Sequence, residues 1–196
     1  MNYDPLLYAA FAGTAVLRGF SCLIDGFNQS FDPSNMKRYN NSKSAFYLHL
    51  HGSPLFYTNV RGEIKKHSTY DLSRHRGINT GHLVLSHFKH KPALISSSPL
   101  LSTYWDCLEE AMQETKSIIL FGYSGADLHL NRLVSVSYNG NGDQVFVVER
   151  KQQGADREWE VKREIRWSDL LPGCRVKVVW LHKITDFHDW GVNLDA

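Results

Sequence analysis

The sequence predicts a single α/β domain over residues 1–196 with a mainly parallel sheet, and three observations support this fold class. The chain of 196 residues has the length of one ordinary domain. In its second half, short apolar segments alternate with amphipathic segments of helical period. Such a strand–helix–strand series implies parallel pairing with right-handed crossovers, so that helices cover the sheet.

The elements of the second half follow one another in a regular order. The segment PLLSTYWDCLEEAMQET is an amphipathic helix, and Ser98 precedes it as a candidate N-cap. The last helix, DREWEVKREIRW, alternates charge sign as a solvated helix face does. The expected elements are helices at 99–115, 126–137 and 156–167 and strands at 116–125, 143–150 and 175–182.

The first half is less regular. A helix is expected from Asp4 to about Arg18, because Asp4 suits the N-cap and Pro5 the first helical position. A turn-rich segment follows, with one short apolar piece at 21–24. The remaining expectations are a strand in AFYLHLHGS (45–53) that ends in a turn at 52–54, a hairpin partner in LFYTNV (55–60), and a polar surface excursion over 61–81.

Composition excludes several classes of protein. The formal net charge is only +2 and the basic residues are scattered, so nucleic-acid binding is not indicated. The three cysteines lie far apart without a C-x-x-C pair, which disfavours a zinc knuckle and a disulfide framework. No apolar run approaches the ~20 residues of a membrane span. We therefore expect a cytoplasmic protein with no membrane partner.

Three polar or glycine-rich segments stand where ligands bind in parallel α/β sheets, beyond the carboxyl ends of strands. In GYSGADLHLN, small residues after an apolar strand let a ligand approach the backbone, and the N–H groups of a helix start suit phosphate or hydroxyl oxygens. The alternative is a tight turn capped by Asp127, which the local pattern alone favours. The residues of this candidate binding loop are Gly122, Ser124, Gly125 and Asp127.

The other two segments are HLHGS and MNYDP. We expect His49 and His51 on one face of a strand, with a structural role for His49 and with His51 facing a cleft from the turn, where it could titrate near neutrality. Asn2 and Asp4 lie in a loop before a helix, and alone they indicate no more than capping by Asp4. The sequence contains neither a P-loop nor a Gly-x-Ser-x-Gly elbow, and no cysteine has an adjacent histidine.

Taken in order, NYD, LHGS and GYSGAD resemble the sirtuin-like NAD-binding domain, and most closely the bacterial sirtuin-like proteins often found in antiphage defence. The likeness runs from Asn2 to about Val148. It implies a Rossmann-like three-layer fold, NAD+ as substrate and no bound metal. It also implies roles: Asn2 beside the nicotinamide ribose, Asp4 on the nicotinamide amide, His51 as base, and Gly122 and Ser124 along the adenosine and ribose portion.

The chain also departs from the family pattern. The family's glycine-rich phosphate turn lies upstream of the Asn-x-Asp motif, whereas here only Met1 precedes Asn2. The resemblance therefore implies the C-terminal portion of a longer domain, weakly active or inactive alone. The zinc-binding cysteines of protein-deacetylating sirtuins are absent, which argues against deacylation. Where sirtuins contact the adenosine ribose this chain has VVER, so an equivalent role for Glu149 is in doubt.

Two functions of different classes remain open. The first is an NAD+ hydrolase that yields nicotinamide and ADP-ribose in its full-length form, with Asn2, Asp4 and His51 at the reacting bond. The second is a catalytically silent module that binds NAD+ or ADP-ribose, or that assembles with a second copy or with a partner supplying the missing half. A degenerate remnant that folds poorly is a third and weaker interpretation.

Overall fold

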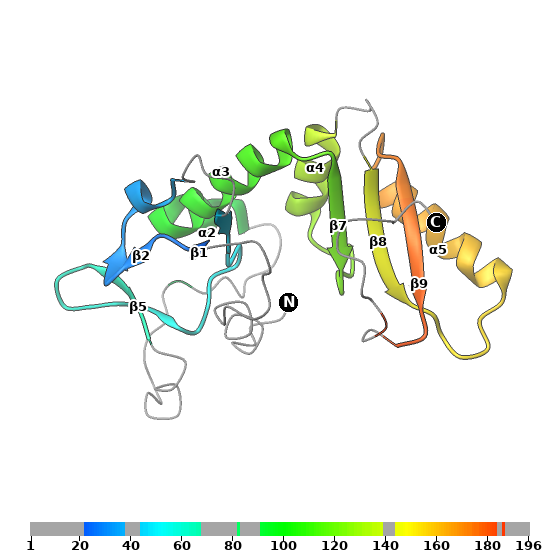
Figure 1. Ribbon diagram of the computed structural model, residues 1–196, viewed down its shortest axis with the longest axis horizontal. Helices are drawn as coiled ribbons and strands as arrows, with labels where there is room; N and C mark the ends of the chain where they lie inside the picture. Colours follow the sequence, from blue (N-terminus) through cyan, green and yellow to red (C-terminus); the bar gives the residue numbers. More distant parts are fainter. Residues whose placement is uncertain are drawn as a thin grey trace. The chain divides into compact units, whose positions relative to one another are not determined.

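A computed structural model of the protein describes residues 22–37, 44–67, 82, 91–138, 144–183 and 186. The chain divides into two compact units, Met1–Leu108 and Glu109–Ala196, which are described separately below (Figure 1). The predicted helix from Asp4 to Arg18 lies outside the described residues. The assignment of the whole chain to one domain stays a prediction.

The second unit contains a three-stranded parallel sheet. Its strands β7 (Ser117–Phe121), β8 (Gln144–Arg150) and β9 (Val176–Leu181) lie side by side in the order β7-β8-β9 (Figure 1). Four successive residues of β8, from Val145 to Val148, are buried. Because neighbouring side chains of a strand point to opposite faces, both faces of β8 are covered, as in a parallel α/β sheet. The predicted α/β fold is confirmed.

Two helices connect these strands. The helix α4 (Leu128–Ser137) follows β7, and α5 (Arg157–Leu170) follows β8 and packs against β9. Each begins at an aspartate whose side chain accepts hydrogen bonds from first-turn N–H groups: Asp127 for α4 and Asp156 for α5. The fully buried Trp167 of α5 contributes the largest side chain to the core.

The first unit contains a parallel pair and two antiparallel ribbons. The strand β1 (Cys22–Ile24) pairs in parallel with β4 (Ser44–Phe46), so the short apolar piece predicted at 21–24 is a strand. Between them lie β2 (Phe27–Asn28), β3 (Ser30–Phe31) and the 3-10 helix η1 (Pro33–Asn35), with β2 antiparallel to β3. The helices α2 (Lys91–Ser97) and α3 (Pro99–Glu114) follow, and Ser98 Oγ accepts from the Leu101 N–H, as expected of the α3 N-cap.

The structure corrects the prediction for residues 45–66. The strand β4 ends at Phe46, so His49 and His51 do not lie on a strand. The second hairpin strand is also different: β5 (Phe56–Thr58) pairs antiparallel with β6 (Ile64–Lys66), in the segment expected to be an irregular excursion. The reason is the turn between them, where the Asn59 side chain accepts from the N–H groups of Arg61 and Glu63, at 2.9 Å each.

The core of the first unit is aromatic. Phe27 stacks on Phe56 with ring centroids 5.1 Å apart, and Phe31 packs edge-on against Tyr104 of α3 at 5.8 Å. Phe56 and Tyr104 are completely buried. These contacts join the β5–β6 hairpin and the β2–β3 ribbon to α3. The same helix contacts the residues that follow β1 and β4.

Candidate functional site

The carboxyl ends of β1 and β4 bring Asp25 and the residues after Phe46 to one edge of the parallel pair. The Tyr47 N–H donates to the Ile24 carbonyl at 2.9 Å, and the Tyr104 hydroxyl donates to the Asp25 carbonyl at 2.7 Å. The buried Asp25 carboxylate accepts from the Phe27 N–H and pairs with the ammonium of Lys66. This ion pair attaches the β5–β6 hairpin to the end of β1.

His51 lies in a tight turn that this edge supports. The Gly52 N–H donates to the His49 carbonyl at 2.8 Å, which closes a turn with Leu50 and His51 as its central residues. Trp105 of α3 donates from its indole nitrogen to the Leu50 carbonyl at 2.9 Å. The His51 and Trp105 rings meet edge to face with centroids 6.2 Å apart. The turn at the candidate catalytic histidine is thus held by hydrogen bonds from two sides.

His49 occupies a different environment. Its ring packs edge-on against Tyr47 at 5.1 Å and Phe56 at 5.3 Å. Burial lowers the pKa of His49 to about 4; the charge of Asp25 opposes this shift, and the charge of Lys66 adds to it. At neutral pH His49 is therefore uncharged and packed between Tyr47 and Phe56, in agreement with the structural role expected for it.

The glycine-rich loop follows β7 at the carboxyl end of the three-stranded sheet. Gly122 and Ser124 are exposed, and a Cβ added at Gly122 would meet no atom within 4 Å. Gly125 differs, because it is buried and an added Cβ would lie 2.6 Å from Leu170 and 3.2 Å from the Trp167 ring. The first glycine leaves open space for a ligand, whereas the second makes room for α5.

Asp127 caps α4. One oxygen of its carboxylate accepts from the N–H groups of His129 and Leu130, at 3.2 and 3.3 Å. The loop is further held by Tyr123, whose hydroxyl donates to the Asn131 amide oxygen at 2.7 Å and accepts from the Asp127 N–H at 3.1 Å. Burial, and then the charge of Asp127, raise the pKa of Tyr123, which stays protonated. The capping interpretation of Asp127 is confirmed, and two N–H groups expected to suit a phosphate are occupied by its carboxylate.

Glu149 at the end of β8 is bound by α5. Both oxygens of its buried carboxylate accept from Arg163, at 2.6 to 3.0 Å, and Oε1 also accepts from the Trp167 indole at 2.5 Å. Sequence reasoning missed this group. The signal was an acidic residue that ends a buried strand, followed by Arg163 and Trp167 one helical turn apart. These contacts assign Glu149 to the packing of α5.

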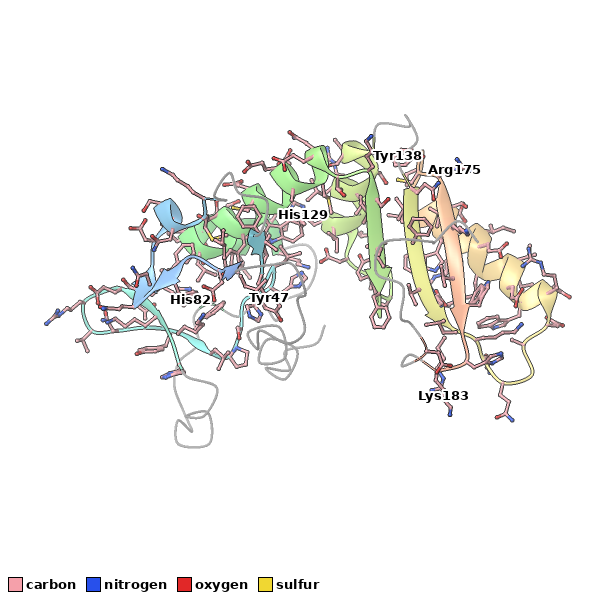
Figure 2. The ribbon with its side chains drawn as sticks, viewed as in Figure 1. Tyr47, His82, His129, Tyr138, Arg175 and Lys183 are labelled. Atoms are coloured by element: carbon pink, nitrogen blue, oxygen red, sulfur yellow. The ribbon has the colours of Figure 1, made fainter. Side chains whose placement is uncertain are left out.

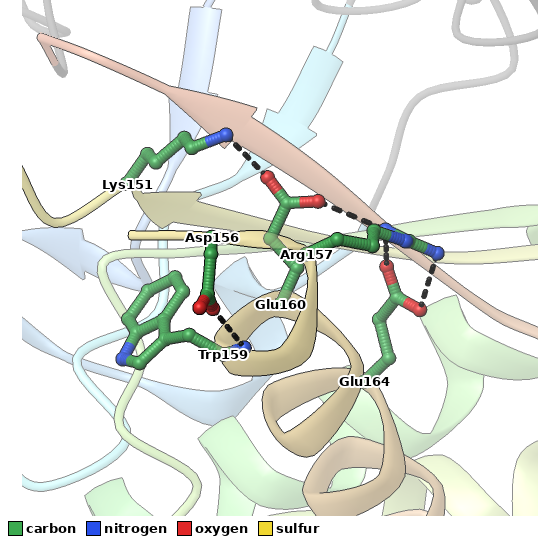
Figure 3. A network of polar contacts seen from close by, with 6 residues as sticks. All are labelled: Lys151, Asp156, Arg157, Trp159, Glu160 and Glu164. Carbon is green, nitrogen blue, oxygen red and sulfur yellow. Dashed lines mark hydrogen bonds and ion pairs between the residues drawn. The ribbon is translucent and has the colours of Figure 1, made fainter. Parts of the chain in front are cut away.

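The first turn of α5 carries a second polar network, drawn in Figure 3. Glu160 accepts from Lys151 at 2.5 Å and from Arg157 at 2.9 Å, and Arg157 also bridges to Glu164 at 3.0 Å. The hydrogen bond from Lys151 and then that from Arg157 lower the pKa of Glu160. The charged residues of α5 that were expected to form a solvated helix face make ion pairs with one another and with Lys151, the residue after β8.

A polar groove of about 630 Å³ lies at the opposite end of the sheet from the glycine-rich loop. It includes the first residues of β8 and β9, and Figure 2 shows Arg175 at this amino end of β9 and Lys183 beyond the other end. Ligands of open parallel sheets bind at carboxyl ends, so this groove is separate from the candidate loop. Its lining residues are Gln144, Glu164, Ser168, Arg175, Val176, Lys177 and Val178.

Neither a metal centre nor a membrane span is found in the part of the chain that the structure describes. Within it, no group of three or more His, Cys, Asp or Glu side chains is arranged to hold a metal ion. No helix there is both long enough and apolar enough to cross a lipid bilayer.

The candidate site residues are distributed over three parts of the chain. Asn2 and Asp4 lie outside the described residues. His51 belongs to the first unit, and the loop of Gly122, Ser124, Gly125 and Asp127 belongs to the second. The convergence of these parts on one cleft stays a prediction.

The fold and loops define the class of the protein. A parallel strand–helix–strand series with a glycine-rich loop beyond its first strand is the arrangement of Rossmann-like α/β domains. The model of the SIR2-like domain family matches residues 1–168, and the chain belongs to this family. SIR2-like domains bind NAD+. A search of curated proteins found no match.

Proposed function

We propose that the protein is an NAD+ hydrolase of the bacterial sirtuin-like type, acting in antiphage defence. The observation that carries the proposal is the family match over residues 1–168, which includes all three motifs: NYD, LHGS and GYSGAD. Substrate and products are NAD+, nicotinamide and ADP-ribose. Cells that carry the full gene are expected to lose NAD+ when infected by a phage that the gene restricts.

The proposed chemistry breaks the bond between the nicotinamide nitrogen and the ribose C1′. As that bond lengthens, positive charge develops on the ribose and its electron pair moves to nicotinamide, which leaves as a neutral base. A water oxygen bonds to C1′ and its proton passes to His51. Asn2 orients the ribose or the water, and Asp4 accepts a hydrogen bond from the nicotinamide amide.

The environment of His51 supports its role as base. The side chain is half-buried, and the turn that carries it is held by the hydrogen bonds that Gly52 and Trp105 donate to the carbonyls of His49 and Leu50. His49, two residues earlier, is uncharged in an aromatic cluster. The aromatic contacts and the lowered pKa of His49 assign it a structural role, which leaves His51 as the candidate base of the two. Exposed Gly122 and Ser124 similarly suit contact with the adenosine side of the substrate.

The test is nicotinamide release from NAD+. It compares the parent protein with His51→Ala, and uses His182→Ala, an exposed histidine beyond the residues that the family model matches, as the matched control. We expect His51→Ala to reduce the rate by about 100-fold or more, as loss of a general base does. Equal and measurable rates for His51→Ala and the parent, in this form or in the extended form, would exclude the assigned role.

Both proteins are also tested with the family's glycine-rich strand placed in frame before Met1. Restored or increased turnover would support a pyrophosphate cradle completed by that segment, or by a partner that supplies it. Calorimetry with NAD+ and with ADP-ribose separates the alternatives. Binding without turnover in both versions would favour the silent binding module, and the absence of binding in both would contradict either function.

A further inference from the structure

Trp105 of α3 contacts both the turn and the ring of the candidate base. Its side chain is 6% exposed, and its indole nitrogen donates to the Leu50 carbonyl at 2.9 Å. That carbonyl belongs to the peptide group that joins Leu50 to His51. Because a peptide group is planar, a hydrogen bond that fixes its oxygen also fixes the plane from which the His51 Cα departs.

A second contact restricts the His51 side chain itself. The edge-to-face contact of the two rings, with centroids 6.2 Å apart and planes at 73°, lies within the range of favourable aromatic pairs. The same tryptophan therefore restrains both the backbone and the ring of His51. Neither restraint is needed to close the turn, because the Gly52 N–H already does so by donating to the His49 carbonyl.

Trp105 is itself held in place by its helix. It lies in the second turn of α3 next to fully buried Tyr104, whose hydroxyl binds the Asp25 carbonyl at the end of β1. Two successive residues of one helix thus bind the chain after β1 and the turn after β4. These strands are paired in parallel, so α3 sets the position of the turn relative to both.

We propose that Trp105 is a positioning residue for the reaction: it holds the imidazole of His51 in the orientation that accepts the proton. This inference rests on the proposed NAD+ hydrolysis. Misplacement of a catalytic group by about 1 Å can cost about 100-fold in rate, so loss of the indole is expected to lower kcat more than it raises KM.

The test variant is Trp105→Phe, which removes the indole N–H while keeping an aromatic ring. Trp159→Phe makes the same chemical change on α5, where the indole packs against Trp180, and is the control. In an active protein, we expect Trp105→Phe to lower kcat by about 10- to 100-fold with KM changed less than about threefold. Equal kinetics for the two variants, or a loss confined to KM, would overturn the proposal.

A second readout does not depend on turnover. The imidazole signals of His51, assigned by their loss in His51→Gln, report the ring's position relative to Trp105 by nuclear magnetic resonance. We expect these signals to move in Trp105→Phe and to stay in place in Trp159→Phe. If Trp105→Phe does not fold, the parent itself provides the measurement, as a nuclear Overhauser contact between the Trp105 indole proton and the His51 amide. Unmoved imidazole signals, or absence of that contact, would overturn the positioning role, whereas absence of turnover in the parent protein would count against the proposed hydrolase.

Discussion

The indole nitrogen of Trp167 and Oε1 of Glu149 are 2.5 Å apart, and this hydrogen bond joins α5 to the carboxyl end of β8. Arg163 binds the same carboxylate from the preceding helical turn. A buried carboxylate with a guanidinium and an indole as partners has little capacity left for a ribose hydroxyl. Its contribution is to the stability of the second unit.

Glu149→Ala is therefore expected to destabilise the protein by roughly 3 kcal/mol, because it leaves the Arg163 charge and the buried Trp167 N–H without their acceptor. The control is Glu158→Ala, which removes an exposed ion pair with Lys162 on the same helix and should cost below about 0.5 kcal/mol. Urea unfolding measures both. Similar losses for the two variants would contradict the buried role of Glu149.

Asp127 allows a separate test of capping against ligand contact. Asp127→Ala should cost about 1 kcal/mol through loss of the α4 cap. Asp156→Ala removes the corresponding cap of α5, a residue to which no ligand role is assigned, and should cost a similar amount. Calorimetry with NAD+ then isolates any role in binding. If Asp127 only caps the helix, both variants keep the parent's affinity, and a selective loss in Asp127→Ala would assign a ligand contact to it.

The two glycines of the loop are expected to respond differently to alanine. Gly122 has φ +63° and open space, so Gly122→Ala should cost about 1 to 2 kcal/mol, the usual penalty of a left-handed alanine. Gly125→Ala adds a steric cost, because the new methyl group meets Leu170 and Trp167, and should lose about 1 to 3 kcal/mol more. Thermal unfolding ranks the two variants, and the reverse order would contradict this packing.

Acidification is expected to destabilise the first unit through His49. Its folded pKa of about 4 lies below the ordinary value of 6.5, so the unfolded chain binds the proton more tightly. The stability contributed by neutral His49 is present above pH 6.5 and is lost as the pH falls towards 4, with a total of roughly 3 kcal/mol. Unfolding across this range is compared with that of His49→Gln, which does not titrate. Parallel curves for the two proteins would disprove the assignment.

The sequence predicted the second unit well because each of its elements depends on local signals. The apolar runs of β7, β8 and β9 and the helical periods of α4 and α5 occur within a few residues of their expected bounds. Asp127 and Ser98 were identified as candidate caps for the same reason, since a cap binds N–H groups only two or three residues away.

The first unit was predicted less well, because its structure depends on partners distant in sequence. Nothing local distinguishes Lys66 as the partner of Asp25, 41 residues earlier, or Trp105 as the donor to Leu50. The alternation around His49 and His51 suggested one long strand, whereas the turn closed by Gly52 and the bond from α3 end it early. Local pattern could identify His51 as a candidate, but it could not reveal what holds it.

The close packing at Gly125 bears on how related chains should be compared. Because the indole of Trp167 and the methyl group of Leu170 fill the space where a side chain would begin, a variant library sorted only by cellular abundance should retain glycine more strongly at 125 than at 122, where only the left-handed φ favours it. Any further enrichment of glycine at 122 under selection for activity would then report its contact with a ligand. In a homologue, glycine at 125 indicates which helix lies behind the loop and carries no information about whether that homologue still binds a dinucleotide.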